Sequence, residues 1–246
     1  NESFHKKKGL LFDLPFRIAI VGKSQMSGKS NFVCNMLLQD DNRLYKNDFE
    51  GYNIYIFSPS ANTDFKLKTL IEEKDIPPQN VYTDYDEEEI DALYEMLKDE
   101  FNEAKEKPQQ KLFFFDDMSA GGNFKKKMHG VIAKIFCNGR HILLSTVVTA
   151  QKYGGDIPTV VRENLTGGVF FSGTDRQLEL ISDDHNHFDK KQTFKSMYRK
   201  VTAEPHSVLI INYSNNLDDR YLNKQFLPIG SCGMVKRHHG GNCACK

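Results

Sequence analysis

The segment that most restricts the fold of this chain is residues 18–30, Ile-Ala-Ile-Val-Gly-Lys-Ser-Gln-Met-Ser-Gly-Lys-Ser. An apolar run that predicts a buried strand leads into a turn with two glycines, and the turn opens a segment with apolar residues at helical spacing. Backbone N–H groups at a helix N-terminus attract anions, and the helix dipole favours negative charge there. The segment therefore predicts a strand–turn–helix unit that binds phosphate.

The end of this segment, Gly28-Lys29-Ser30, is typical of the phosphate loop of P-loop nucleotide hydrolases. In that motif Lys29 would contact the β- and γ-phosphates of ATP, and the Ser30 hydroxyl would be a ligand of Mg²⁺. We assign nucleotide binding to Gly22, Lys23, Ser24, Gln25, Met26, Ser27, Gly28, Lys29, Ser30 and Asn31.

The spacing of the two glycines departs from the usual motif. Four residues normally separate the first glycine from Gly-Lys-Ser, whereas five separate Gly22 from Gly28. Either the loop is one residue longer, or Lys23 occupies a position that glycine normally holds. The alternative to a phosphate loop is a Gly/Ser-rich turn that binds nothing.

A second motif is the apolar strand of residues 112–117, Leu-Phe-Phe-Phe-Asp-Asp, which ends in two carboxylates. Ligands of α/β sheets bind at the C-terminal ends of the strands. Asp116 is placed there to hold Mg²⁺, directly or through water, and Asp117 to polarise the attacking water as a base. Considered alone, the pattern fits equally well a strand that simply enters a polar turn. Because it follows a Gly-Lys-Ser segment, it predicts the second half of a Mg-nucleotide site.

A third motif is the strand that follows Gly139-Arg140 and ends in Gln151. An amide at that position would lie beside the γ-phosphate and sense it or orient water. The alternative is an ordinary core strand with a solvent-facing glutamine. The presence of the other two motifs favours the functional interpretation.

Composition excludes some classes of protein. Lys+Arg and Asp+Glu both number 33, so any contact with DNA must come from a local patch or from copies arranged in a ring. The longest apolar stretch, around residues 142–150, is too short to span a bilayer, and residues 1–8 lack the apolar region of a secretory signal. We expect a soluble, intracellular protein with no transmembrane segment.

Apolar strands alternate with amphipathic helices, which predicts βαβ units and a mainly parallel sheet. The expected strands are residues 16–21, 52–57, 81–83, 111–115, 141–150, 168–171 and 207–212. The expected helices are residues 29–39, 65–74, 86–107, 124–138, 158–164, 174–183 and 190–200. We divide the chain into an N-terminal arm (1–13), one P-loop ATPase domain (14–230) and a flexible tail (231–246).

Two groups of histidines and cysteines could mimic metal sites. Cys232, Cys243 and Cys245 accompany His238 and His239 in the tail, but Cys-x-Cys is not the usual zinc-ligand spacing, which favours a flexible Gly-rich tail. The second group, His185 and His187, is interpreted as part of a polar loop.

Taken in order, these motifs resemble the DNA-packaging ATPases of poxviruses, other large double-stranded DNA viruses, virophages and Maverick-type elements, within the FtsK/HerA superfamily. The resemblance covers residues 14–171 and weakens beyond them. Departures are the extra loop residue and Asp117, where many members have Glu. The residues that carry it are Leu14-Pro15-Phe16-Arg17, Gly28-Lys29-Ser30, Phe57-Ser58-Pro59, Phe114-Phe115-Asp116-Asp117, Gly139-Arg140-His141, Gln151 and Arg162-Glu163-Asn164.

The resemblance implies a three-layer P-loop NTPase fold of the additional-strand (ASCE) type and a homo-oligomeric ring with ATP and Mg²⁺ at each interface. A positive charge from the neighbouring subunit would stabilise the γ-phosphate, and Arg140 and Arg162 are the candidates. For each arginine the alternative is a surface or salt-bridging role. The implied partners are double-stranded DNA, bound without sequence specificity, and capsid or portal components, in the host-cell cytoplasm or with the virion.

Lys125, Lys126 and Lys127 follow a Gly-Gly loop and, repeated around a ring, could track DNA phosphates without reading bases. A solvated helix N-terminus explains them as well.

The reading as a packaging motor has two rivals. A P-loop small-molecule kinase, such as a nucleoside kinase, would need an acceptor pocket and an Arg-rich lid, and no Arg cluster follows the acidic strand. A non-enzymatic DNA- or capsid-associated protein with a degenerate P-loop gains some weight from the irregular glycine spacing.

Overall fold

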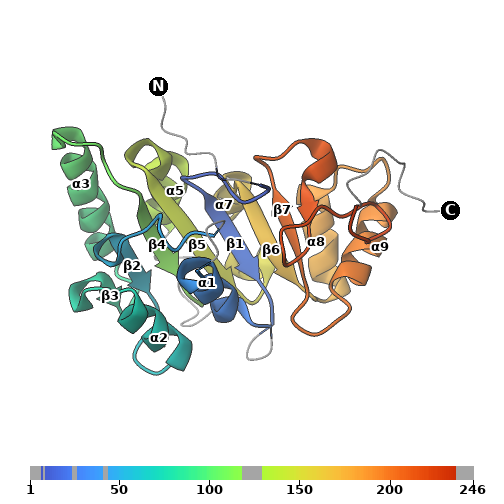
Figure 1. Ribbon diagram of the computed structural model, residues 1–246, viewed down its shortest axis with the longest axis horizontal. Helices are drawn as coiled ribbons and strands as arrows, with labels where there is room; N and C mark the ends of the chain where they lie inside the picture. Colours follow the sequence, from blue (N-terminus) through green and yellow to red (C-terminus); the bar gives the residue numbers. More distant parts are fainter. Residues whose placement is uncertain (1–6, 8, 24–26, 41–43, 118–128, 237–246) are drawn as a thin grey trace.

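A computed structural model describes residues 7, 9–23, 27–40, 44–117 and 129–236 (Figure 1). Within these residues eight strands form one sheet in the order β3-β2-β4-β5-β1-β6-β7-β8. The strands are β1 (Arg17–Val21), β2 (Ile54–Phe57), β3 (Val81–Tyr82), β4 (Lys111–Phe115), β5 (Leu144–Ala150), β6 (Gly167–Phe171), β7 (Val208–Asn212) and β8 (Tyr221–Leu222). The α-helices are α1 (Lys29–Leu38), α2 (Phe65–Glu73), α3 (Glu87–Glu103), α5 (His129–Asn138), α6 (Tyr153–Asp156), α7 (Thr159–Glu163), α8 (Asp175–His185) and α9 (Lys191–Val201).

The sheet is mainly parallel. Strands β3, β2, β4, β5, β1 and β6 pair in parallel, and β7 and β8 join them as antiparallel strands at one edge. Strand β5 lies between β1, which leads to the phosphate loop, and β4, which ends in the aspartates. This inserted strand confirms the predicted additional-strand fold.

Both faces of the sheet are buried, and successive strand residues alternate between them. In β1, Ile18 and Ile20 belong to one hydrophobic cluster, whereas Ala19 and Val21 belong to the other. The cluster that contains Ile18 includes residues of α1 and α2, and the cluster that contains Ala19 includes residues of α3, α5, α8 and α9. Helices therefore cover each face, which gives the three predicted layers.

The N-terminal residues 9–12 pack against the same core as α1. Leu11 and Phe12 are buried, and the amide of Asn212 on β7 donates hydrogen bonds to the carbonyl oxygens of Leu10 (3.0 Å) and Leu11 (2.9 Å). The division of the chain into arm, domain and tail stays a prediction, although these arm residues contribute to the core.

Several element boundaries differ from the sequence predictions. The strand predicted at residues 141–150 begins only at Leu144, because Gly139–Ile142 forms a 3₁₀ helix and Leu143 takes a left-handed conformation (φ 56°). Strand β2 begins at Ile54, after a 3₁₀ turn at Gly51–Asn53, and α3 ends at Glu103. The two-residue strand β8 was not predicted, since so short a segment carries no periodic pattern.

The interpretation of His185 as part of a polar loop is wrong. Helix α8 continues through His185, whose side chain is 1% exposed and belongs to the interior. His187 lies beyond the helix and donates its backbone N–H to the Tyr221 hydroxyl (2.8 Å).

Some predicted features lie outside the described residues: Lys125, Lys126, Lys127, His238, His239, Cys243 and Cys245. Among the residues that are described, no three His, Cys, Asp or Glu side chains gather in a group able to hold a metal ion. No helix in that part of the chain is both long and apolar enough to cross a membrane.

Candidate nucleotide-binding site

The three predicted motifs meet at one edge of the sheet. Strands β4, β5 and β1 are neighbours and run in parallel, so their C-terminal ends lie together. The phosphate loop follows β1, the aspartates follow β4 and Gln151 follows β5. The backbone N–H of Gly22 donates to the carbonyl oxygen of Ala150 (3.1 Å), which joins the loop to the strand that carries Gln151.

At both glycine positions of the loop, a residue with a Cβ would be sterically unfavourable. Gly28 takes a left-handed conformation (φ 87°) directly before α1, which favours a residue without Cβ. At Gly22 a Cβ would come within 2.6 Å of the Ser27 Cβ and 3.0 Å of the Phe171 Cβ. The loop therefore folds back on its own start, although Ser24, Gln25 and Met26 lie outside the described residues.

Lys29 lies over this loop. Its Nζ donates hydrogen bonds to the carbonyl oxygens of Gly22 (2.9 Å) and Lys23 (3.3 Å). Burial lowers the pKa of Lys29, while the carboxylates of Asp117, Asp116 and Asp156 oppose that shift. The ammonium group thus lies in the field of the two aspartates that the sequence predicts as its partners.

Asp116 is a buried carboxylate with two hydroxyl donors. The residue is 4% exposed. Its Oδ1 accepts a hydrogen bond from Thr149 Oγ1 (2.7 Å), and its Oδ2 accepts one from Ser58 Oγ (3.1 Å). Burial raises the pKa of Asp116, and the two hydrogen bonds act in the opposite direction. The Tyr85 hydroxyl donates to the Asp116 carbonyl oxygen.

Asp117 and Gln151 are in direct contact. Gln151 Nε2 donates to Asp117 Oδ1 (3.3 Å), and the Asp117 backbone N–H donates to Thr149 Oγ1 (2.8 Å). Asp117 has a left-handed backbone (φ 52°), a conformation that non-glycine residues seldom adopt and that clusters at functional sites. Gln151 is itself held, since its backbone N–H donates to Asp156 Oδ2 (3.1 Å).

The donor set fits a magnesium ion with a triphosphate. The hydroxyl of Ser30, in the first turn of α1, and the Asp116 carboxylate are hard oxygen ligands of the kind Mg²⁺ prefers. Asn31, next in the helix, is exposed and borders a cavity beside the loop.

Sequence reasoning missed Thr149, Tyr85 and Asp156 as parts of this site. A signal for Thr149 existed: β5 is buried along its whole length, and most buried hydroxyls have a hydrogen-bond partner. Tyr85 and Asp156 lie in short segments whose position depends on the folded chain.

The two candidate arginines lie in different surroundings. Arg140 is exposed in the 3₁₀ helix before β5. It therefore lies where the parallel strands begin, whereas the loop lies where they end, about 20 Å away by strand length. Burial, followed by the charge of Arg140, lowers the pKa of Arg17, so two cations lie near one another there. Within one subunit Arg140 is therefore separated from the nucleotide site.

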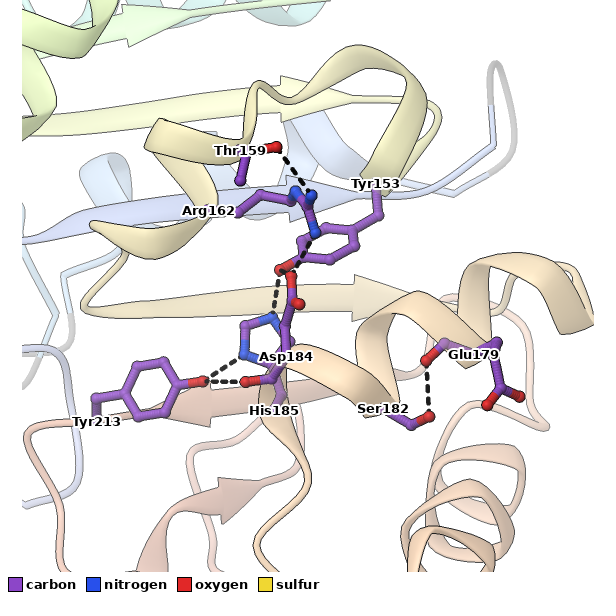
Figure 2. Close-up of polar contacts among 8 residues, drawn as sticks. All are labelled: Tyr153, Thr159, Arg162, Glu179, Ser182, Asp184, His185 and Tyr213. Carbon is purple, nitrogen blue, oxygen red and sulfur yellow. Dashed lines mark hydrogen bonds and ion pairs between the residues drawn. The ribbon is translucent and has the colours of Figure 1, made fainter.

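Arg162 belongs to a polar network of its own chain (Figure 2). Its Nη1 forms a 2.6 Å ion pair with Asp184, its Nη2 donates to the Thr159 hydroxyl (3.2 Å), and its guanidinium lies 5.3 Å from the Tyr153 ring centre. The Tyr153 hydroxyl also contacts Asp184 Oδ2 (2.7 Å). Arg162 thus has the salt-bridging contacts that its alternative interpretation requires.

Comparison with solved structures agrees with this fold. The genome packaging NTPase B204 from Sulfolobus turreted icosahedral virus 2, in complex with AMPPCP, is 16% identical with a TM-score of 0.54, over 81% of this chain and 92% of that chain. EssC (ATPases 2 and 3) from Geobacillus thermodenitrificans is 17% identical with a TM-score of 0.55, over 80% of this chain. The present chain spans only 38% of that EssC chain. At these identities the likeness establishes the fold.

A third structure, the pCW3 conjugation coupling protein TcpA with ATPγS, is 12% identical with a TM-score of 0.52, over 85% of this chain and 59% of that chain. No curated protein sequence matches significantly. The family model described as Poxvirus A32 protein matches residues 2–222, nearly the whole chain. With the phosphate loop, the acidic strand and the glutamine strand assembled at one sheet edge, the chain therefore belongs to the poxvirus A32 protein family.

Proposed function

We propose that this protein is an ATP-hydrolysing motor that moves double-stranded viral DNA into a capsid. The observation that carries the proposal is the convergence of Lys29, the Asp116–Asp117 pair and Gln151 at the ends of three adjacent parallel strands. Membership of the A32 family and likeness to a genome packaging NTPase support it.

The roles follow from the contacts. Lys29 would leave its own loop carbonyls for the β- and γ-phosphates, and Ser30 and Asp116 would hold Mg²⁺, which would neutralise phosphate charge. Asp117 would accept the proton of the attacking water, and Gln151, hydrogen-bonded to Asp117, would orient that water beside the γ-phosphate.

We further propose a ring in which Arg140 acts on the neighbouring subunit's ATP. Arg140 is exposed and remote from its own phosphate loop, whereas Arg162 is engaged by Asp184 and Tyr153 within its chain. A cation near developing γ-phosphate charge contributes strongly to phosphoryl transfer. Arg162 is the second candidate and would first have to break its ion pair.

The remaining partners follow from the family resemblance. Double-stranded DNA would be held by its phosphates, with the ring bringing copies of Lys125, Lys126 and Lys127 together, since the net charge of one chain is zero. Capsid or portal components in the host-cell cytoplasm complete the proposal.

The experiment is ATP hydrolysis by the purified protein, with and without duplex DNA. Duplex DNA is expected to raise the rate. Lys29→Ala is expected to abolish hydrolysis by weakening nucleotide binding, and Asp117→Asn to stop turnover while binding persists. Exposed matched controls are Lys68→Ala and Asp218→Asn, which are expected to hydrolyse ATP like the parent. If the Lys29 and Asp117 variants also keep the parent rate, the assigned roles are wrong; transfer of phosphate to an added nucleoside would favour a kinase instead.

A further inference from the structure

A cavity of about 730 Å³ opens beside the phosphate loop, and most of its lining lies outside the three motifs. Its lining includes Ser27, Gly28 and Asn31, so it is continuous with the loop and with the N-terminus of α1. Its size lies within the range typical of small-molecule sites. A ligand whose phosphates bind at this loop therefore has its remaining atoms directly beside the cavity.

One wall is a single face of α1. Phe32, Asn35 and Met36 follow one another at helical spacing along the cavity, with Asn35 exposed and Met36 buried. This wall places apolar carbon next to side-chain amides, which donate and accept hydrogen bonds.

The rest of the lining includes residues 224–228 and residues 9–11, which are far apart in the sequence. Phe226 makes two ring contacts: its ring centre lies 5.8 Å from that of Phe12, edge to face, and 6.3 Å from that of Phe32. The turn that holds it is closed by Asn223, whose Oδ1 accepts the backbone N–H groups of Gln225 and Leu227 (3.0 Å each).

The backbone at the rim is strained. Phe226 (φ 56°) and His206 (φ 59°) both take left-handed conformations that non-glycine residues avoid, and both line the cavity. An ideal Cβ on Gly28 would lie 3.5 Å from His206 Nδ1, so this histidine borders the phosphate loop itself. Strained residues of this kind cluster at binding sites, where the surrounding structure maintains them.

We propose that this cavity binds the nucleoside of the ATP whose phosphates occupy the loop, with the Phe226 ring against the base. The proposal rests on the proposed function of the loop and deepens it. Nucleotide affinity then depends on residues 224–228, which carry none of the sequence motifs. Stacking of a base on an aromatic ring is possible for every base, because every base has a π-face. It costs little conformational entropy, and apolar surroundings strengthen it.

The test separates the nucleoside from the phosphates. Equilibrium binding of a non-hydrolysable ATP analogue and of inorganic tripolyphosphate, each with Mg²⁺, is measured on the full chain. Phe226→Ala is expected to weaken the analogue roughly tenfold to a hundredfold and to leave tripolyphosphate unchanged. Leu217→Ala, at an exposed apolar residue between β7 and β8 that does not line the cavity, is the matched control and is expected to change neither.

A second variant guards against loss of folding. Asn35→Trp fills the cavity from an exposed helix position without removing any core contact, and it is expected to weaken the analogue selectively as well. If both variants bind the analogue like the parent, or weaken both ligands equally, the cavity does not hold the nucleoside. Lys29→Ala should weaken both ligands; if it weakens neither, the phosphate site fails instead, and the two failures are distinguishable.

Discussion

Thr149 donates a 2.7 Å hydrogen bond to Asp116 Oδ1, and through the same oxygen it accepts the backbone N–H of the next residue, Asp117. One hydroxyl in the middle strand therefore positions both carboxylates at the end of the neighbouring strand. The register makes this possible, because Phe115 pairs with Val148 and the following residues lie side by side. The spacing of metal-binding and water-activating groups is thus set across the sheet.

We expect Thr149→Val to lower the free energy of unfolding by about 1–3 kcal/mol and to reduce ATP turnover. Valine keeps the shape of threonine but leaves the Asp117 N–H and an Asp116 oxygen without this partner. Chemical denaturation and steady-state hydrolysis are the measurements.

Thr146→Val is a matched control in the same strand. The Thr146 hydroxyl is buried and, within the described part of the chain, has no hydrogen-bond partner. This substitution is expected to leave activity intact and to keep or raise stability. Equal effects of the two substitutions would show that the Thr149 bridge has no special role.

Asp116→Asn is expected to stabilise the nucleotide-free protein while abolishing hydrolysis. Burial raises the pKa of Asp116 in the folded state, so ionisation destabilises the fold at neutral pH, and this destabilisation disappears as the pH falls through the folded pKa. Asparagine removes the buried charge, and the Ser58 hydroxyl can reverse to accept from the new amide.

The measurement is the midpoint of thermal unfolding at neutral pH without nucleotide or Mg²⁺. Each kcal/mol gained corresponds to about 2–4 °C for a chain of this size. Asp218→Asn, at an exposed position, should not shift the midpoint. A lower midpoint for Asp116→Asn than for the parent would contradict the argument.

Mixing experiments separate the two arginines. Arg140→Ala and Lys29→Ala are each expected to be inactive alone. Mixed subunits should regain measurable hydrolysis, because some interfaces then combine an intact phosphate loop with an intact Arg140. No recovery in assembled mixtures would argue against action of Arg140 on a neighbour.

Arg162→Ala is expected to act mainly on stability. It removes the ion pair to Asp184 and the contact with the Tyr153 ring (Figure 2). The pair is partly exposed and Asp184 keeps the Tyr153 hydroxyl as a donor, so the unfolding midpoint should fall by a small amount, on the order of 1 kcal/mol of stability or less. An unchanged midpoint together with lost, mixing-rescued activity would instead assign the neighbour's cation to Arg162.

The same network predicts a pH dependence of folding. Burial lowers the pKa of His185 to about 4. The charge of Asp184 opposes this shift, whereas the charges of His187 and Arg162 add to it. Its ring lies between the hydroxyls of Tyr153 (2.8 Å) and Tyr213 (Figure 2). The folded pKa is below the unfolded value, so the stability that neutral His185 contributes is present above pH 6.5 and is lost as the pH falls towards 4.

Over that window the loss amounts to about 3 kcal/mol. His185→Gln should flatten the dependence of unfolding free energy on pH between 7 and 4, compared with the parent and with the exposed His141→Gln. Identical slopes for parent and His185→Gln would show that this histidine does not titrate in the window.

Much of the fold was predictable from local patterns. Continuous apolar runs predicted β1, β2 and β4, and the order of strands and helices predicted a parallel three-layer sheet. Because carboxyl ends of parallel strands meet at one edge, the motifs also predicted that the phosphate loop, the aspartates and Gln151 lie together.

What the sequence determined by itself, then, is the set of chemical groups and the sheet edge at which they stand, since both depend on short-range periodicity and strand direction. Tertiary structure alone decided which distant groups come into contact: Thr149 with both aspartates, residues 224–228 with the cavity beside α1, and Arg162 with Asp184. These pairings join segments far apart in the chain, and only the packing of buried side chains selects them from the many partners that hydrogen-bonding and charged groups would accept.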